Sequence, residues 1–196
     1  MVVLVLGLVV FLGIHSVSIV APAWRDAQVA RLGEGPWKGI YSIAAAAGLA
    51  GIVVGYGLAR QSPVVLWAPP VWTRHLALVL MLPALVLLAA AYLPGRIQAA
   101  ARHPMLLAVK IWATAHLLAN GTLADVLLFG GFLAWAVADR ISVKRRAGGA
   151  SGPPAHAPRA RNDAIAIVLG LLVWAALVFG GHRWLFGVAP LPALSA

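Results

Sequence analysis

Long apolar runs separated by short polar breaks dominate the chain. A membrane-spanning helix needs about 20 consecutive, mostly apolar residues, and six segments reach or approach that length. They are Val2–Ala21, Trp37–Ala59, Val71–Leu93, Pro104–Ala119, Thr122–Ala138 and Ala164–Phe186, the fourth being short. The pattern predicts an all-α fold, a polytopic transmembrane helix bundle of about six spans with short interfacial helices.

The breaks between these runs carry residues that end helices or lie flat at a membrane surface. After Pro22, apolar and charged positions alternate in the stretch 24–35, which predicts a short interfacial helix. A second interfacial stretch, 96–103, follows Pro94-Gly95, and Asn120-Gly121 predicts a tight turn between two spans. The residues assigned to the first interfacial loop are Trp24, Arg25, Trp37 and Lys38.

A basic segment rich in Gly, Pro, Ser and Ala covers about 141–162 and predicts a mobile linker. No internal repeat divides the chain, so residues 1–196 are expected to form a single membrane domain.

Composition supports lipid as the solvent. Of the 196 residues, 62% are hydrophobic and only 10% are charged, whereas a soluble domain carries about 25% charged residues. The net charge is +10, but the basic residues are not interleaved with aromatics in a polar stretch, so we expect no nucleic-acid partner. The absence of cysteine excludes disulfides, Cys-ligated zinc, iron–sulfur clusters and thiol catalysis.

The basic residues are divided unevenly between the two sides of the predicted bundle. The loops after the first, third and fifth spans hold 11 Lys and Arg residues, whereas the other side holds three. Because the richer side faces the cytoplasm, both termini are predicted to lie outside it, with the basic 141–162 loop inside.

Several histidines fall within the apolar spans or at their ends, where polar groups are costly. They are His15, His75, His103, His116 and His182. Neutral imidazole is tolerated in an apolar interior and is a good ligand for haem iron. The alternative is that each histidine hydrogen-bonds a neighbouring helix and helps packing. No metal other than haem iron is expected.

Lys110, Asn120 and Asp125 are further polar groups near these spans. Lys110 can extend its stem to the lipid headgroups, or it can pair with Asp125 or with a ligand carboxylate. No catalytic triad, zinc-protease motif or phosphate-binding glycine loop is present. The residues alone therefore predict a helix bundle with several intramembrane histidines, for which a haem or metal site is one alternative. They indicate no reaction.

Two stretches are similar to a known family. These stretches closely resemble the NnrU family of bacterial membrane proteins. They are HPMLLAVKIWATAHLLANGTLADVLLFGGFLAWAVADR (103–140) and GIHSVSIVAPAWRDAQVARLGEGPWKGIYS (13–42). The combination of His-Pro, Trp-x-x-x-His and Leu-Ala-Asn-Gly is specific, and the resemblance covers most of the chain. It implies a protein of the bacterial inner membrane that is associated with denitrification and nitric oxide metabolism.

The same resemblance implies a cofactor. The family is related to the plant 15-cis-ζ-carotene isomerase, a membrane enzyme that carries haem b, and that enzyme's two haem-ligating histidines look like His15 and His116 here. We therefore expect haem b with these two axial ligands. The isomerase has a cysteine three residues before the second histidine, but Ala113 stands at that place, so a thiolate cannot exchange with the imidazole.

The expected helix ends place His15 and His116 at different depths. At a rise of about 1.5 Å per residue, both lie roughly 5–6 Å from the midplane, on opposite sides. Two axial ligands of an upright haem lie at similar depth, so other pairings stay open. The alternative ligands are His103, His75 and His182.

Three functions follow from these interpretations. The first is a haem b membrane protein of redox or nitrogen-oxide metabolism, with the lipid bilayer and other membrane redox proteins as partners. The second is a haem-dependent cis-trans isomerase of a lipophilic polyene, which rests on family analogy. The third is a non-enzymatic assembly or interaction protein in which the histidines serve packing. The sequence leaves enzymatic activity and oligomeric state open.

Overall fold

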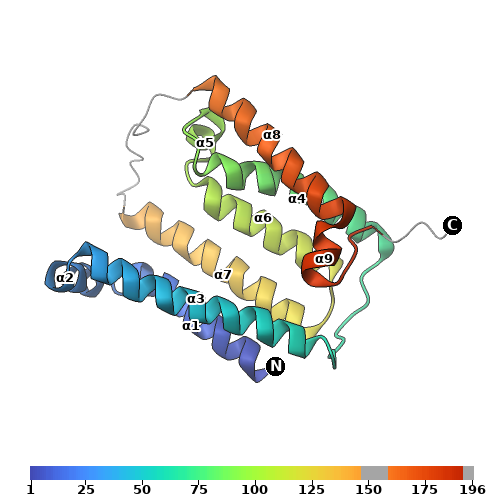
Figure 1. Cartoon of the computed structure of the whole chain (residues 1–196), viewed down its shortest axis with the longest axis horizontal. Coiled ribbons are helices and arrows are strands. Elements are labelled where there is room, and N and C mark those ends of the chain that lie inside the picture. The colour runs from blue at the N-terminus through green and yellow to red at the C-terminus, as the bar shows by residue number, and fades with distance from the viewer. Residues whose placement is uncertain (147–158, 192–196) are drawn as a thin grey trace. The chain divides into compact units, whose positions relative to one another are not determined.

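The computed structural model describes residues 1–146 and 159–191, and helices account for most of these ranges (Figure 1). In chain order they are α1 (Val2–Val20), α2 (Pro22–Leu32), α3 (Glu34–Ala59), α4 (Val71–Ala90), α5 (Arg96–Ala101), α6 (Pro104–Ala119), α7 (Leu123–Arg146), α8 (Ala160–Ala176), the π-helical turn η1 (Leu177–Gly181) and α9 (His182–Phe186). The expected all-α architecture is confirmed.

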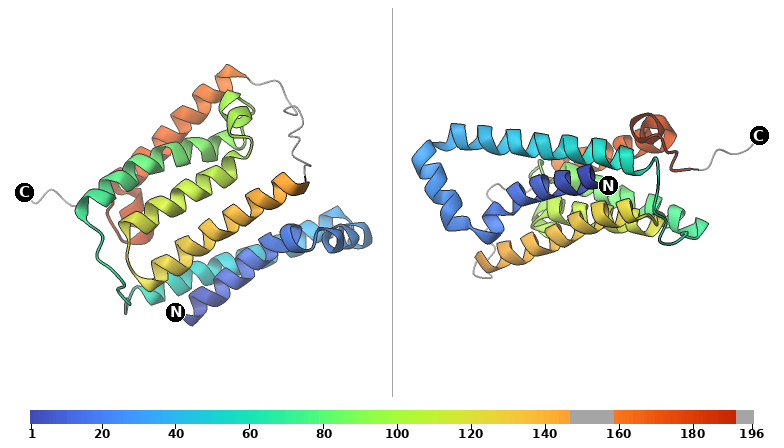
Figure 2. Two further views of the ribbon diagram at one scale, coloured as in Figure 1. Left: turned by 180° about the vertical axis from the view of Figure 1, so that it is seen from behind. Right: turned by 90° about the horizontal axis from the view of Figure 1, so that it is seen from below.

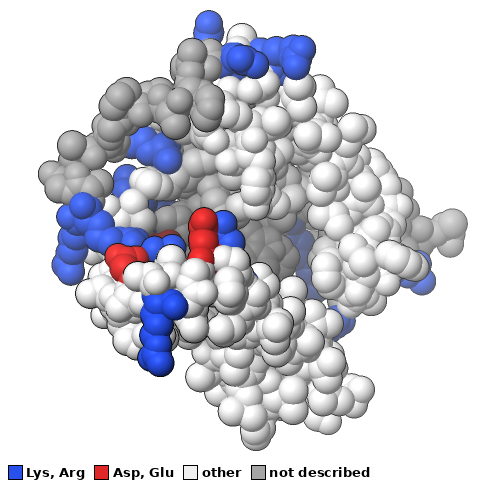
Figure 3. All heavy atoms as spheres, turned by 60° about the vertical axis from the view of Figure 1, so that its left-hand side comes forward, with Lys and Arg blue, Asp and Glu red and all other residues white. Residues whose placement is uncertain are grey.

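Among the described residues, five helical segments are long and apolar enough to cross a membrane, namely α1, α3, α4, α7 and the continuous stretch Ala160–Phe186. The shorter apolar helix α6 accompanies them. Branched aliphatic side chains are widely exposed, for example Ile43 at 73% and Val53 at 65%, and most of the surface in view carries no charge (Figure 3). Such a surface suits lipid rather than water, so the chain is a multi-pass membrane protein.

The helices form two compact units. Unit 1 contains Met1–Ala68 and Gly121–Arg146, and unit 2 contains Pro69–Asn120 and the chain beyond Arg146. The single membrane domain stays a prediction.

Close packing of α1 against α3 organises unit 1. A Cβ atom added to Gly48 would overlap the backbone of Phe11, and one added to Gly55 would overlap the backbone of Leu4. Small residues at this helical spacing let two backbones approach closely without a hydrophobic driving force. The helix α2 joins the end of α1 to the start of α3 (Figure 2, right), and α7 packs along α1.

In unit 2, α4 packs against both α6 and α8. The indole Nε1 of Trp174 donates to the carbonyl of Leu78 at 2.9 Å. The carboxylate of Asp163 in α8 accepts the backbone N–H groups of Arg96 at 3.0 Å and Ile97 at 2.9 Å. Asp163 therefore satisfies free donors at the start of α5, as capping groups do.

The helix ends differ from the predicted ones where charged residues follow an apolar run. The predicted fifth span ends at Ala138, but α7 continues to Arg146 with three basic residues in its last turn. Lys and Arg are good helix formers and interact favourably with a helix C-terminus, so the helix extends beyond its apolar part. Consequently no linker begins at 141, and α8 already covers 160–162. The rest of that predicted linker, 147–158, lies outside the described residues.

Candidate functional site

An open cavity of about 590 Å³ lies in unit 1, at the end where α2 joins α1 to α3. We call it the His15 cavity. Its lining includes His15, Arg25, Trp37, Lys38, Tyr41 and Arg146. Three of the predicted interfacial-loop residues, Arg25, Trp37 and Lys38, therefore line the same space as a predicted haem ligand.

The imidazole of His15 is fixed by its own helix. Its Nδ1 lies 2.6 Å from the carbonyl oxygen of Phe11, one turn earlier in α1. Because a carbonyl oxygen can only accept, this bond requires the proton on Nδ1 and leaves the lone pair on Nε2. Histidines that bind metals are commonly oriented by such a bond from the other ring nitrogen.

Aromatic rings from three helices surround this imidazole. Phe11 of α1 stacks on it with ring centroids 4.3 Å apart. Tyr41 of α3 lies at 5.2 Å and Trp135 of α7 at 5.9 Å, both edge-on. These contacts restrict the imidazole ring. Of the three aromatic residues only Tyr41 also lines the cavity, together with Trp37.

Trp135, whose ring contacts His15, has an unmatched donor. Its indole Nε1 is buried and has no hydrogen-bond partner among the described residues. A buried indole N–H normally finds an acceptor, which this one lacks, although Trp135 is not among the residues that line the cavity.

Three cations line the same cavity, and each has a carboxylate nearby. Arg25 lies 2.8 Å from Asp26, and Lys38 lies 2.8 Å from Glu34. The Arg146 guanidinium lies 3.5 Å from Asp139. The first two pairs are largely exposed, and such pairs contribute about 1 kcal/mol or less. The cavity therefore combines an imidazole, an aromatic wall and weakly held positive charge.

His116 lies in α6 of unit 2 and has the same local arrangement as His15. Its Nδ1 is 2.8 Å from the carbonyl oxygen of Trp112, and the Trp112 ring lies 5.4 Å from the imidazole. Both histidines thus follow an aromatic residue by four positions and carry the proton on Nδ1. They belong to different units, and their pairing on one iron stays a prediction.

The alternative ligands have varied surroundings. His75 is exposed on α4, and His103 immediately precedes α6. His182 places Nδ1 at 2.7 Å from the carbonyl oxygen of Val188, where it closes the turn after α9. His15 and His116 share a bond from Nδ1 to the carbonyl of the preceding turn, and the role of His75, His103 and His182 as ligands stays a prediction.

Two of the predicted supporting residues have structural partners. Asp125 is only 4% exposed and accepts hydrogen bonds from the Tyr56 hydroxyl and from both the backbone N–H and the hydroxyl of Thr122. The Asp125 N–H in turn points to the Thr122 hydroxyl at 3.3 Å, which is the reciprocal pattern of a capping box at the start of α7. Asn120 donates to the His116 carbonyl at 2.9 Å and so satisfies the end of α6.

Lys110 lines a separate groove of unit 2 with apolar residues of α4 and α6. Its ammonium makes no hydrogen bond or ion pair within the described ranges 1–146 and 159–191. The carboxylate of Asp125 accepts bonds from Tyr56 and Thr122, and Asp125 belongs to the other unit, so the partner of Lys110 stays a prediction.

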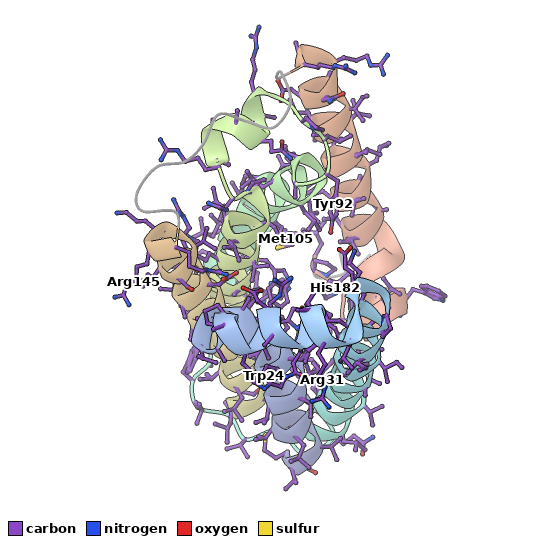
Figure 4. The ribbon with its side chains drawn as sticks, turned by 90° about the vertical axis from the view of Figure 1, so that its left-hand side faces the viewer. Trp24, Arg31, Tyr92, Met105, Arg145 and His182 are labelled. Carbon is purple, nitrogen blue, oxygen red and sulfur yellow. The ribbon has the colours of Figure 1, made fainter. Side chains whose placement is uncertain are left out.

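The predicted interfacial stretch is a helix, α2, and none of its residues is buried. Trp24 and Arg31 extend from the same side of it (Figure 4). The Trp24 ring lies 5.9 Å from that of Trp37, which is only 8% exposed. This contact ties α2 to α3, and the position of α2 at a membrane surface stays a prediction.

Sequence reasoning did not single out Tyr41, Trp135 or Arg146. All three lie near His15 only because α3 and α7 pack beside α1. One signal was readable beforehand, namely the aromatic residue four positions before each histidine, at Phe11 and Trp112.

No group of three His, Asp or Glu side chains that could hold a metal ion occurs in the part of the chain that the structure describes.

A family model described as NnrU protein matches residues 3–190. This range contains every described helix apart from the first residue of α1. No curated protein and no solved structure shows significant similarity to the chain.

Proposed function

This chain belongs to the NnrU family, and we propose that it is a membrane protein that binds haem b and serves the metabolism of nitric oxide and related nitrogen oxides. The observation that carries the proposal is the state of His15. Its Nδ1 bond to Phe11 directs the lone pair of Nε2 away from the helix backbone, beside a cavity of about 590 Å³. Cofactor pockets typically measure about 300–1,000 Å³.

The chemistry of the lining residues fits a porphyrin. His15 supplies an imidazole, and Trp37 and Tyr41 supply rings against which a flat macrocycle can pack. For the second axial position the family resemblance names His116, which has the same protonated Nδ1.

When bound, haem supplies a redox-active iron whose potential depends on its axial ligands and on the surrounding polarity. The chain's own residues orient the His15 ring and hold its proton on Nδ1 through the Phe11 carbonyl. The aromatic side chains of Phe11, Tyr41 and Trp135 restrict the rotation of the imidazole. A hydrogen bond from Nδ1 and close ring contacts are the features that keep an iron-binding histidine basic and correctly oriented.

The test is a haem assay on the full chain purified in detergent after expression with haem supplied. We expect a Soret band, and a pyridine haemochrome spectrum of the b type. His15→Ala should lose most of the haem, and His116→Ala should do so if it is the second ligand. Ser16→Ala is the matched control, because Ser16 lies next to His15 and bonds only the Leu12 carbonyl. A wild-type protein that stays free of haem would sink the proposal.

Parallel variants of the other histidines assign the second ligand. His75→Ala, His103→Ala and His182→Ala should retain haem if His116 is the ligand. Loss of haem in one of them, with retention in His116→Ala, would move the second axial position to that residue while leaving His15 in place.

A further inference from the structure

We infer that Arg25, Lys38 and Arg146 form a carboxylate-binding subsite in the His15 cavity, which holds the two propionates of a bound porphyrin. This inference rests on the proposed function. In the haem-bound protein His15 would hold the iron, and the three cations, which come from α2, the start of α3 and the end of α7, would hold the propionates.

The first support is the position of Lys38 along α3. Lys38 precedes Tyr41 by three residues, and Tyr41 contacts the His15 ring. Residues three apart share a helix face, and the separation along the axis is about 4.5 Å. The ammonium of Lys38 therefore belongs to the same wall of the cavity as Tyr41, about one turn closer to the start of the helix.

The second support is a similar offset along α7. Trp135 contacts His15, and Asp139 follows it by one turn, about 6 Å along the axis. Arg146, at the last position of α7, reaches back so that its guanidinium lies 3.5 Å from Asp139. The cations of α3 and α7 are thus both displaced from the imidazole, and both line the one cavity.

The third support is the balance of charge. Arg25, Lys38 and Arg146 line the cavity, whereas Glu34 is the only carboxylate among its lining residues in the described chain. Exposed ion pairs are weak and easily exchanged, so an incoming carboxylate can join or replace the present partners. Guanidinium groups suit this role because they bind carboxylates through two parallel hydrogen bonds.

A molecule that satisfies the whole cavity must be flat and apolar at one edge and anionic at the other. A porphyrin with two propionates has this shape and charge. A lipid phosphate could satisfy the cations, but it would leave the His15 imidazole and the Trp37 and Tyr41 rings without a partner.

The test separates the propionates from the rest of the cofactor. The haem-free full chain in detergent is titrated with haem b and, separately, with its dimethyl ester, in which both carboxylates are masked, while the Soret band is followed. We expect the wild type to bind haem about 10- to 100-fold more tightly than the ester, as two or more charge-assisted bonds would give. Arg25→Gln/Lys38→Gln/Arg146→Gln should lose this preference and bind the ester like the wild type.

The matched control removes the same charge at the same end of unit 1 without touching the cavity. Arg31→Gln/Lys144→Gln/Arg145→Gln changes exposed residues of α2 and α7 that do not line it, and the Arg145 side chain projects outward from α7 (Figure 4). This variant should keep the wild-type preference. Lys38→Gln alone, at a largely exposed pair, gives a smaller loss if the triple variant does not fold.

Each outcome has one meaning. Equal binding of haem and ester by the wild type, or an equal loss of preference in the control variant, overturns the subsite while leaving haem binding intact. If the wild type loses its preference for haem over the ester when anionic lipid vesicles are added, the cations bind lipid phosphate, and the subsite is likewise overturned. A wild type that develops no Soret band with either compound refutes the proposed function itself.

Discussion

The polar groups at the two ends of unit 1 differ in whether their hydrogen bonds are complete. At the end where α7 begins, Asp125 is saturated by donors from Tyr56 and Thr122. At the other end, His15 keeps a lone pair on Nε2 beside an open cavity, and Trp135, whose ring contacts His15, keeps an unmatched N–H. In an apolar bundle, a complete hydrogen-bond set indicates a structural role, whereas an incomplete set beside a cavity favours a ligand.

The largest expected effect is on the saturated end. Asp125→Ala would leave the Tyr56 hydroxyl and the Thr122 backbone N–H without their acceptor. We expect the free energy of unfolding in detergent to fall by about 3 kcal/mol, with the haem affinity of the remaining folded protein unchanged. A variant that loses haem but not stability would reverse the roles assigned to the two ends.

The next effect tests the scaffold that both ends share. Gly55→Ala would place a Cβ atom against the backbone of Leu4 in α1, and overpacking of this kind costs about 1–3 kcal/mol. We expect thermal unfolding in detergent at a lower temperature. Gly57→Ala is the control, because a Cβ atom there meets nothing within 4 Å, and its unfolding temperature should not fall.

A smaller change in stability is expected at His15. In the haem-free protein, His15→Ala removes the aromatic contacts of the imidazole, which contribute about 1 kcal/mol. The same variant should lose most of its haem, so its cofactor defect far exceeds its unfolding defect. Equal defects would indicate that His15, like Asp125, serves packing.

The smallest effect is expected at Trp135. Trp135→Phe keeps an aromatic ring but removes an N–H that has no partner in the described residues, so the haem-free protein should unfold with nearly unchanged free energy, within about 0.5 kcal/mol. Haem affinity, measured by titration of the Soret band, should fall if the donor meets the cofactor. A clear loss of stability in the haem-free variant would instead show that the indole N–H is already satisfied in the folded protein.

The spans could be predicted because lipid thickness sets the length of an apolar run. The bounds of α6 agree with the predicted Pro104–Ala119. The end of α7 could not be predicted from hydropathy, because the helix continues through Lys144–Arg146 after the apolar run has ended. Charged residues outside the lipid neither require nor forbid helix, so the apolar pattern carries no information about where such a helix stops.

The site was only partly accessible to sequence reasoning. His15 and His116 were identified from a family motif, and the interfacial-loop residues Arg25 and Lys38 were identified without their connection to His15. Tyr41 and Trp135 were missed for a physical reason. A helix in lipid is apolar on all sides, so its periodicity does not mark the face that meets another helix. The packing of α1 against α3 and α7 had to be known first.

The bond from His15 to position 11 has an evolutionary consequence, because its acceptor is a main-chain oxygen. Any amino acid at that position presents the same oxygen, so the ring can keep its tautomer while the stacking partner changes. Phe11→Leu should therefore alter the electronic surroundings of the imidazole and leave its orientation unchanged. Relatives can therefore vary residue 11 and change the surroundings of this imidazole without losing the bond that orients it.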